Sequence, residues 1–160
     1  MLLYEQGKEA PMKIQLIIDE KFQETEVQIC AKEYNDQIER LMKQLQLAQK
    51  VTVLDGYLQQ EIHMLKIKDI YFIYAEGSKV YLQTTEHEFE SKRKLYELEE
   101  MLSNDFVRVS KSTLVNIDKI ASIQMGRIGS TEIVLDDESS VHVSRKYLKE
   151  LKSRLGIGRD

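Results

Sequence analysis

Short runs in which apolar and polar residues alternate recur along the chain, and such runs are typical of half-buried β-strands. The first run covers residues 12–18, several more fill residues 51–91, and others follow within residues 106–143. Because strands of this length are common in small antiparallel sheets, the pattern predicts a protein whose main part is built from short strands.

Turn-forming residues separate these runs and predict tight hairpins between neighbouring strands. Four such turns are expected, and they fall at Asp55-Gly56, at Gly77-Ser78, at residues 126–129 around Arg127, and at residues 136–139. Since a tight turn joins antiparallel strands only, the predicted sheets are antiparallel.

Three stretches have the three- to four-residue apolar spacing of amphipathic helices instead. From about Thr25 this spacing continues to Leu45 and predicts one long helix. Ser91 is expected to cap a shorter helix over residues 91–104, and residues 147–155 belong to a last one. The predicted fold class is therefore α+β: a mostly β domain of short antiparallel sheets, preceded by a small strand–long helix–strand unit.

A polar loop at residues 110–113 interrupts two apolar runs and is the first candidate for function. Its hydroxyl and ammonium groups suit phosphate oxygens and base edges, with Arg108 and Lys111 supplying charge and Ser110 and Ser112 short hydrogen bonds. The alternative is a solvated loop whose serines bond their own backbone, as turn serines commonly do. The loop by itself leaves both interpretations open.

The order of residues around this loop resembles the LytTR DNA-binding domain of bacterial response regulators. Residues 106–120 combine a strand carrying Arg108, the Ser-Lys-Ser loop, and the steps LVN and IDKI. The stretch KDIYFIYAEGSKVYL at residues 68–82 is similar to that family's opening strand, loop and strand, and VHVSRKYLKEL at residues 141–151 to its closing stretch. The resemblance spans residues 51–155.

The resemblance implies binding to double-stranded DNA from one face, through loops rather than a recognition helix, at two repeated half-sites and with DNA bending. It makes Ser78 and Lys79 candidates, because the corresponding turn approaches DNA in the family. Three lysines are the expected groove contacts: Lys79, Lys111 and Lys146. Five further residues are expected to grip the DNA backbone or orient the loops: Arg108, Ser110, Ser112, Ser144 and Arg145. Which of Arg145 and Lys146 reaches a base is left open.

Three other positions near these motifs are interpreted in structural terms. Asn116, which follows the polar loop, is expected to hold the chain in place rather than to touch a base. The turn at residues 136–139 has no glycine, and His142 stands where the family tends to have proline. These two departures concern the path into the last strand.

The charge distribution is uneven although the formal net charge is only -4. Residues 139–160 hold six Lys or Arg against two acidic residues, a net charge of +4, whereas residues 61–138 hold ten against fifteen, a net charge of -5. A nucleic-acid binder normally carries a basic footprint. The C-terminal segment is therefore the expected electropositive end.

No pattern of a catalytic or metal site is present in the sequence. The histidines His63, His87 and His142 lie far apart, and none has a partner at metal-ligand spacing. There is no phosphate-binding loop, no dinucleotide-binding glycine pattern and no nucleophile elbow. We therefore expect no cofactor, no metal ion and no enzymatic activity.

The chain of 160 residues is long enough for one good core, or for one domain with a small appendage. No apolar run approaches the roughly 20 residues that a membrane-spanning helix needs, and no signal-peptide pattern opens the chain. The single cysteine, Cys30, falls in the apolar stripe of the predicted long helix and is expected to be a structural thiol. These features favour a cytoplasmic protein.

Four segments are expected along the chain. Residues 1–11 read as a leader, with Met12 as the natural start or the leader as an added segment. Residues 12–50 form a strand–helix unit that we expect to dimerise, residues 51–156 the LytTR-like domain, and residues 157–160 a tail. The first unit is too short for a receiver domain, so phosphorylation is not the expected input. The alternative function is a protein-interaction or ligand-responsive module on the same fold, without DNA binding.

Overall fold

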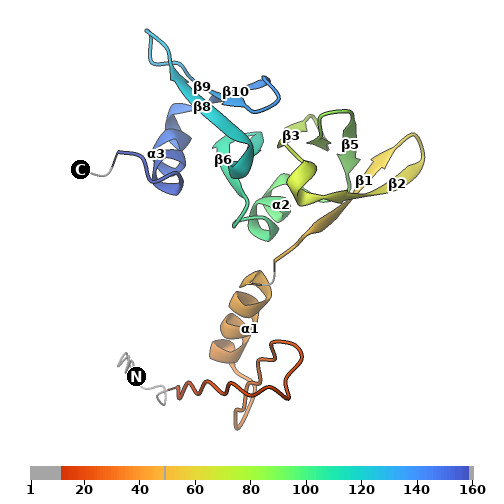
Figure 1. Ribbon diagram of the computed structural model, residues 1–160, viewed down its shortest axis with the longest axis vertical. Helices are drawn as coiled ribbons and strands as arrows, with labels where there is room; N and C mark the ends of the chain where they lie inside the picture. The colour runs from red at the N-terminus through yellow and green to blue at the C-terminus, as the bar shows by residue number, and fades with distance from the viewer. Residues whose placement is uncertain (1–11, 49, 159–160) are drawn as a thin grey trace. The chain divides into compact units, whose positions relative to one another are not determined.

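The computed structural model describes residues 12–48 and 50–158. The expected leader, residues 1–11, lies outside these ranges. The chain divides into two units, Met1–Glu39 and Arg40–Asp160. Strands dominate the second unit, and the protein is an α+β protein, as predicted (Figure 1).

The strand predicted at residues 12–18 is wrong. These residues form no regular secondary structure, and the side chains of Ile14, Leu16 and Ile18 are 87 %, 82 % and 88 % exposed. Alternation of apolar residues stabilises a strand only when a neighbouring strand supplies hydrogen bonds and a core covers one face. The described structure gives this segment neither partner nor cover.

The long helix is shorter than predicted, since α1 covers Asp36–Ala48. Its first turn is capped by Asn35, whose Oδ1 accepts a hydrogen bond from the Ile38 N–H at 3.0 Å. Residues 25–34 precede this cap and are not helical. Cys30 is therefore an exposed free thiol and not part of an apolar stripe, contrary to the prediction.

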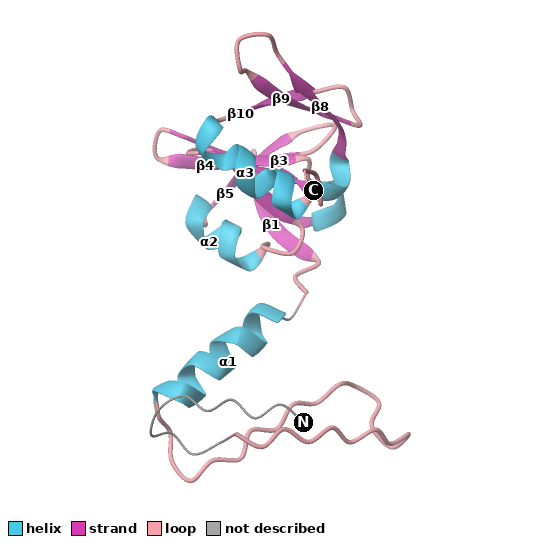
Figure 2. Ribbon diagram, turned by 90° about the vertical axis from the view of Figure 1, so that its left-hand side faces the viewer, coloured by secondary structure: helices cyan, strands magenta, loops and turns pink. Residues whose placement is uncertain are grey.

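The described residues contain ten strands in two antiparallel sheets. The larger sheet has the order β2-β1-β5-β4-β3-β7-β6. Its strands are β1 Val53–Leu58, β2 Glu61–Lys66, β3 Phe72–Glu76, β4 Lys79–Gln83, β5 Glu88–Ser91, β6 Phe106–Ser110 and β7 Thr113–Asn116. The smaller sheet, which stands beside the helix α3 in Figure 2, has the order β10-β9-β8. Its strands are β8 Ile120–Met125, β9 Thr131–Leu135 and β10 Ser140–Val143.

Two helices cover opposite faces of the larger sheet. Successive residues of a strand point to opposite faces, and Leu114 and Val115 of β7 accordingly belong to two different hydrophobic cores. The helix α2, Leu95–Met101, closes the first core with Leu98, which is fully buried. The helix α3, Arg145–Arg154, closes the second core with Leu151, together with the smaller sheet.

Asn116 is a structural residue, as predicted. It is 2 % exposed, and its Nδ2 donates a hydrogen bond to the Ile70 carbonyl at 2.8 Å. Its Oδ1 accepts a hydrogen bond from the Asp118 N–H at 3.1 Å. This one side chain therefore ties the 3-10 turn η1, Ile67–Asp69, to the 3-10 turn η2, Ile117–Lys119.

The first predicted hairpin turn is misplaced. Asp55 and Gly56 lie inside β1, paired with β2, and the turn itself is formed by Gln59 and Gln60. Both glutamines have positive φ, 49° and 68°, the combination that a type I′ turn requires. Gly56 has another role, because a Cβ there would lie 2.8 Å from the Cβ of Phe89, so the close approach of β5 excludes a side chain.

The other three predicted turns are confirmed. The β3–β4 turn is formed by Gly77, with φ 59°, and Ser78. The β8–β9 and β9–β10 turns fall within residues 126–130 and 136–139. Glu138 in the last turn has φ 70°, a conformation that favours glycine. This turn therefore lacks the glycine, but its backbone has the conformation that a glycine would favour.

The cap predicted for the second helix is wrong by one turn. α2 begins at Leu95 after the N-cap residue Lys94, whose N–H donates a hydrogen bond to the Glu97 carboxylate at 2.6 Å. Ser91 remains in β5, where it is paired with Val80 of β4. Ser91 therefore belongs to the sheet, and the helix begins only after the pairing between β4 and β5 has ended.

Candidate nucleic-acid interface

The β6–β7 turn presents Lys111 and Ser112 to solvent, and Arg108 holds this turn in shape. The Arg108 Nε donates a hydrogen bond to the Ser110 carbonyl at 2.7 Å, and a terminal nitrogen donates to the Lys111 carbonyl. Another terminal nitrogen forms an ion pair with the Glu99 carboxylate at 2.6 Å. The Arg108 side chain is only 16 % exposed. The largely buried guanidinium therefore stabilises the turn through the turn's backbone carbonyls.

The two serines of this turn have different environments. The Ser110 Oγ accepts a hydrogen bond from the Ser112 N–H at 3.2 Å, which is the contact with the loop's own backbone that the alternative interpretation predicts. The Ser112 carbonyl accepts a hydrogen bond from the Ala75 N–H of β3 at 2.8 Å. Within the described residues the Ser112 hydroxyl has no hydrogen-bond partner, so it is free to meet a ligand.

The first turn of α3 lies next to the same end of β6. The Ser144 N–H donates a hydrogen bond to the Val109 carbonyl at 2.9 Å, and Val109 directly precedes the polar turn. Ser144 is the N-cap residue of α3, but its hydroxyl makes no capping bond. Arg145 and Lys146 follow and are exposed. The free N–H groups of a helix start favour anions, and two cations at this start strengthen that preference.

The β3–β4 turn lies on the other side of the polar turn, because the bond between Ala75 and Ser112 joins the two. Ser78 is exposed, whereas the Lys79 ammonium is bound to the Glu90 carboxylate at 3.0 Å. This hydrogen bond raises the pKa of Lys79 and lowers the pKa of Glu90. Lys79 is 55 % exposed and would have to exchange Glu90 for another partner in order to contact a phosphate or a base.

Three segments therefore form one row along the molecule: the β3–β4 turn, the β6–β7 turn and the start of α3. The bond from Ala75 to Ser112 connects the first two, and the bond from Ser144 to Val109 connects the last two. In the part of the chain that the structure describes, Lys111, Arg145 and Lys146 have no acidic partner. The row thus combines cations without acidic partners, free hydroxyl groups and a helix start, which suit phosphates and base edges. The Lys146 ammonium lies 5.5 Å from the centre of the Tyr147 ring.

A fourth segment, the β8–β9 turn, lies beside this row; sequence reasoning predicted the turn but not its position. A Cβ placed on Gly129 of this turn would lie 3.5 Å from a terminal nitrogen of Arg145, so the guanidinium lies against the turn. Figure 1 shows the β8–β9 hairpin extending past β6 and α3. A Gly-Arg-Ile-Gly sequence marks the turn, but nothing in that sequence says which other segment it meets.

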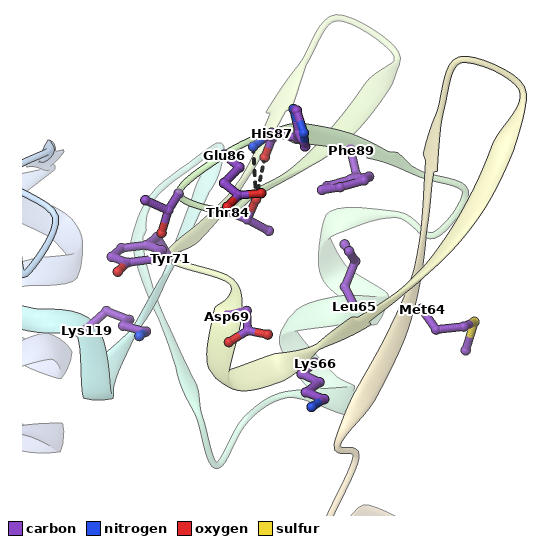
Figure 3. Close-up of a pocket in the computed structure, with 11 residues that line it drawn as sticks. Met64, Leu65, Lys66, Asp69, Tyr71, Thr84, Glu86, His87, Phe89 and Lys119 are labelled. Carbon is purple, nitrogen blue, oxygen red and sulfur yellow. Dashed lines mark hydrogen bonds between the residues drawn. The ribbon is translucent and has the colours of Figure 1, made fainter.

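A separate hollow of about 490 Å³ lies between β2, η1, the β4–β5 connection and Lys119. In Figure 3, Leu65 and Phe89 form one wall of the hollow, Tyr71 and Lys119 the opposite wall, and Asp69 lies between them. Both charge signs line it, and it shares no lining residue with the row. The described residues contain no group of three or more metal-ligating side chains.

The protein is thus an antiparallel β domain in which the row of two turns and a helix start presents cationic and hydroxyl side chains on one surface. Residues 60–156 match the family of LytTr DNA-binding domains, and the chain belongs to that family. It is 33 % identical over 146 residues to an uncharacterized HTH-type transcriptional regulator of Staphylococcus aureus strain MSSA476, covering 91 % of this chain and 99 % of the relative. The counterpart in strain NCTC 8325 is 32 % identical over the same lengths.

A solved structure, a LytTr DNA-binding domain from Bacillus cereus, has the same fold. Its TM-score against this chain is 0.63 at 22 % identity, covering 67 % of this chain and 99 % of that one. The relatives are named for a helix-turn-helix, yet in the described residues strands separate α1, α2 and α3 from one another. No two helices of the described chain form such a pair. None of the helices in the described residues has the length and apolar composition of a membrane-spanning segment.

Proposed function

We propose that this protein is a sequence-specific regulator of transcription that binds double-stranded DNA through the row of turns. The observation that carries this proposal is the continuity of the β3–β4 turn, the β6–β7 turn and the start of α3. Among the residues that the structure describes, Lys111, Arg145 and Lys146 of this row have no acidic partner. Membership of the LytTr family and the names of the Staphylococcus relatives support it. The protein acts in the bacterial cytoplasm, where its DNA lies.

The residues of the row have distinct roles in this proposal. Lys111 and Lys146 enter the groove, where a bidentate contact to guanine gives about 1–3 kcal/mol of base discrimination. Arg145, Ser112 and Ser144 bind phosphates, which fixes the register without reading sequence. Lys79 and Ser78 join them once Lys79 leaves Glu90. Arg108 and Ser110 contact no DNA and hold the β6–β7 turn in its shape.

The domain boundaries follow from these roles. Residues 51–156 form the DNA-binding domain, and residues 12–50 bring two copies together on repeated half-sites. The apolar side chains of α1 support this second assignment, because Ile38, Leu41 and Leu45 are only half-buried and Met42 is 42 % exposed. An amphipathic helix with an uncovered stripe gains free energy by packing against a second copy.

Deletion of residues 1–49 tests the dimer. Light scattering is expected to give twice the monomer mass for the full chain and the monomer mass for the shortened one. A shortened chain that stays dimeric would assign the contact to the DNA-binding domain instead. The signal that controls the regulator does not pass through a phosphorylated receiver within these 160 residues.

The DNA-binding proposal is tested by titrating the full chain against its own upstream promoter fragment and a scrambled fragment of equal length, at two salt concentrations. The expected result is a complex specific to the promoter, whose affinity falls steeply with salt because phosphate contacts release counterions. Equal and weak binding to both fragments would contradict the proposal.

Equal binding to both fragments would favour a ligand-responsive module, for which the hollow between β2 and the β4–β5 connection is the candidate site. A cavity of about 490 Å³ falls within the range of small-molecule pockets. Phe89 and Leu65 would supply apolar contacts there, and Lys66 and Asp69 polar ones.

A further inference from the structure

The β8–β9 turn, residues 126–130, carries two exposed side chains, Arg127 and Ile128, that no core or ion pair of the described residues uses. Ile128 is 88 % exposed, and it belongs to neither hydrophobic core. Its neighbour Arg127 is exposed and, within the described part of the chain, has no acidic partner. Residues 120–131 contain no Asp or Glu at all, so Arg127 is the only charge of the β8 strand and this turn.

The turn has a defined shape. The Gly126 N–H donates a hydrogen bond to the Ser130 carbonyl at 2.7 Å and closes its base. A Cβ on Gly126 would collide with the Ser130 hydroxyl, and Gly129 has φ 70°, where glycine is favoured. Arg127 and Ile128 are therefore held out at the end of a hairpin by the two glycines that bracket them.

The turn lies beside the start of α3. The Arg145 guanidinium lies against Gly129, and Arg145 belongs to the start of α3. The turn is thus the next segment of the row after α3, and Arg127 extends the same unpaired positive charge. A single exposed apolar side chain is common on protein surfaces, but here it stands beside a surface that the proposed function places on DNA.

We propose that the β8–β9 turn is a minor-groove contact of this protein, with Arg127 binding phosphate or the groove floor and Ile128 acting as an apolar wedge. This inference rests on the proposed function. The minor groove, about 6 Å wide, flanks the major groove in which the proposed function places the Lys146 side chain, and its width suits single side chains. Arginines are attracted to narrow minor grooves, and apolar wedges inserted between base steps bend the duplex.

The test compares the full-length wild type with Ile128→Ser and Arg127→Ala on the promoter fragment. Ile62→Ser is the matched control, because Ile62 is also an exposed isoleucine, 62 % exposed, but lies in β2 at the edge of the larger sheet opposite β6. Energy transfer between dyes at the two fragment ends reports bending, and titration at several salt concentrations reports affinity and its salt dependence.

Ile128→Ser is expected to bind about tenfold more weakly and to bend the fragment less, since the wedge that opens the base step is lost. Arg127→Ala is expected to reduce the slope of log affinity against log salt by about 0.9, one phosphate contact. Netropsin, which occupies the minor groove, is expected to compete with the wild type more strongly than with the Ile128→Ser variant. Ile62→Ser is expected to match the wild type throughout.

The possible failures are distinguishable. A wild type that binds promoter and scrambled DNA equally overturns the proposed function and this inference together. A wild type that binds specifically, with Ile128→Ser and Arg127→Ala indistinguishable from Ile62→Ser, overturns the inference alone. Specific binding that netropsin does not weaken also overturns it, because the contact would then lie outside the minor groove.

Discussion

Replacement of Arg108 separates two roles that an arginine beside a DNA-binding loop can have. In the structure its guanidinium is divided among the Ser110 carbonyl, the Lys111 carbonyl and the Glu99 carboxylate, and the side chain is 16 % exposed. This arrangement uses the planar fork of the guanidinium, which a lysine ammonium lacks. If Arg108 instead bound phosphate, DNA affinity would depend mainly on its positive charge and less on the planar shape of its guanidinium.

The expected loss of stability follows from these contacts. A hydrogen bond to a charged group contributes about 1.5–3 kcal/mol to stability. When the guanidinium is removed, water replaces it at the two loop carbonyls and at Glu99, which is 44 % exposed. The loss of the three contacts therefore costs much less than three times the value for one hydrogen bond. We expect Arg108→Ala to lower the free energy of unfolding by about 2 kcal/mol, or Tm by about 4–8 °C for a chain of this size.

The assay combines thermal unfolding with promoter titration for the wild type, Arg108→Ala and Arg108→Lys. Both variants are expected to bind more weakly, because the β6–β7 turn loses its shape and Lys111 its position. The salt dependence of binding should stay at the wild-type slope in both, since no phosphate contact is removed. Wild-type affinity in Arg108→Lys, or a slope reduced by about 0.9 in Arg108→Ala with unchanged Tm, would refute the positioning role.

Three further predictions concern single side chains. Lys111→Ala is expected to lose about 1–3 kcal/mol of discrimination between promoter and scrambled DNA in the same titration, whereas Lys68→Ala, an exposed lysine of η1, should bind as the wild type does. Glu138→Gly is expected to raise the free energy of unfolding in urea by about 0.5–1 kcal/mol, because φ 70° is unfavourable for a side chain; an unchanged midpoint would contradict this. Partial burial and the hydrogen bond to Glu88 raise the pKa of Tyr74 above its usual 10.0, so the stability tied to its neutral form is present below that pH and is lost as pH rises through the raised value. Urea unfolding at about pH 9 and pH 11 should therefore show a smaller fall for Tyr74→Phe than for the wild type.

The local pattern of the sequence was sufficient where one segment contains all the determining contacts. The turns at Gly77 and at residues 126–130 and 136–139 were predicted because the residues that form them are adjacent in the chain. The apolar positions of α2 were predicted for the same reason, since Leu98 and its neighbours recur at helical spacing. The structural role of Asn116 followed from an amide placed between two apolar steps.

Prediction failed where distant residues decide the outcome. Residues 12–18 alternate like a strand, but no second strand pairs with them in the described structure. Gly56 looks like a turn residue, yet it is needed because Phe89 of another strand approaches its backbone. The sequence made Lys79 an expected groove contact and left Arg108 either to grip the DNA backbone or to orient the loops. Their carboxylate partners, Glu90 and Glu99, are visible only in the folded protein.

Apolar periodicity and turn chemistry act over a few residues, so they are enough to predict an α+β protein of short antiparallel strands with a polar turn between β6 and β7. The segments that lie beside that turn become visible only in the folded chain. The bond from Ser144 to Val109 and the contact of Arg145 with Gly129 join parts of the chain that lie far apart in sequence. Such contacts depend on how two sheets and two helices share their cores, and that packing brings the free cations together on one surface.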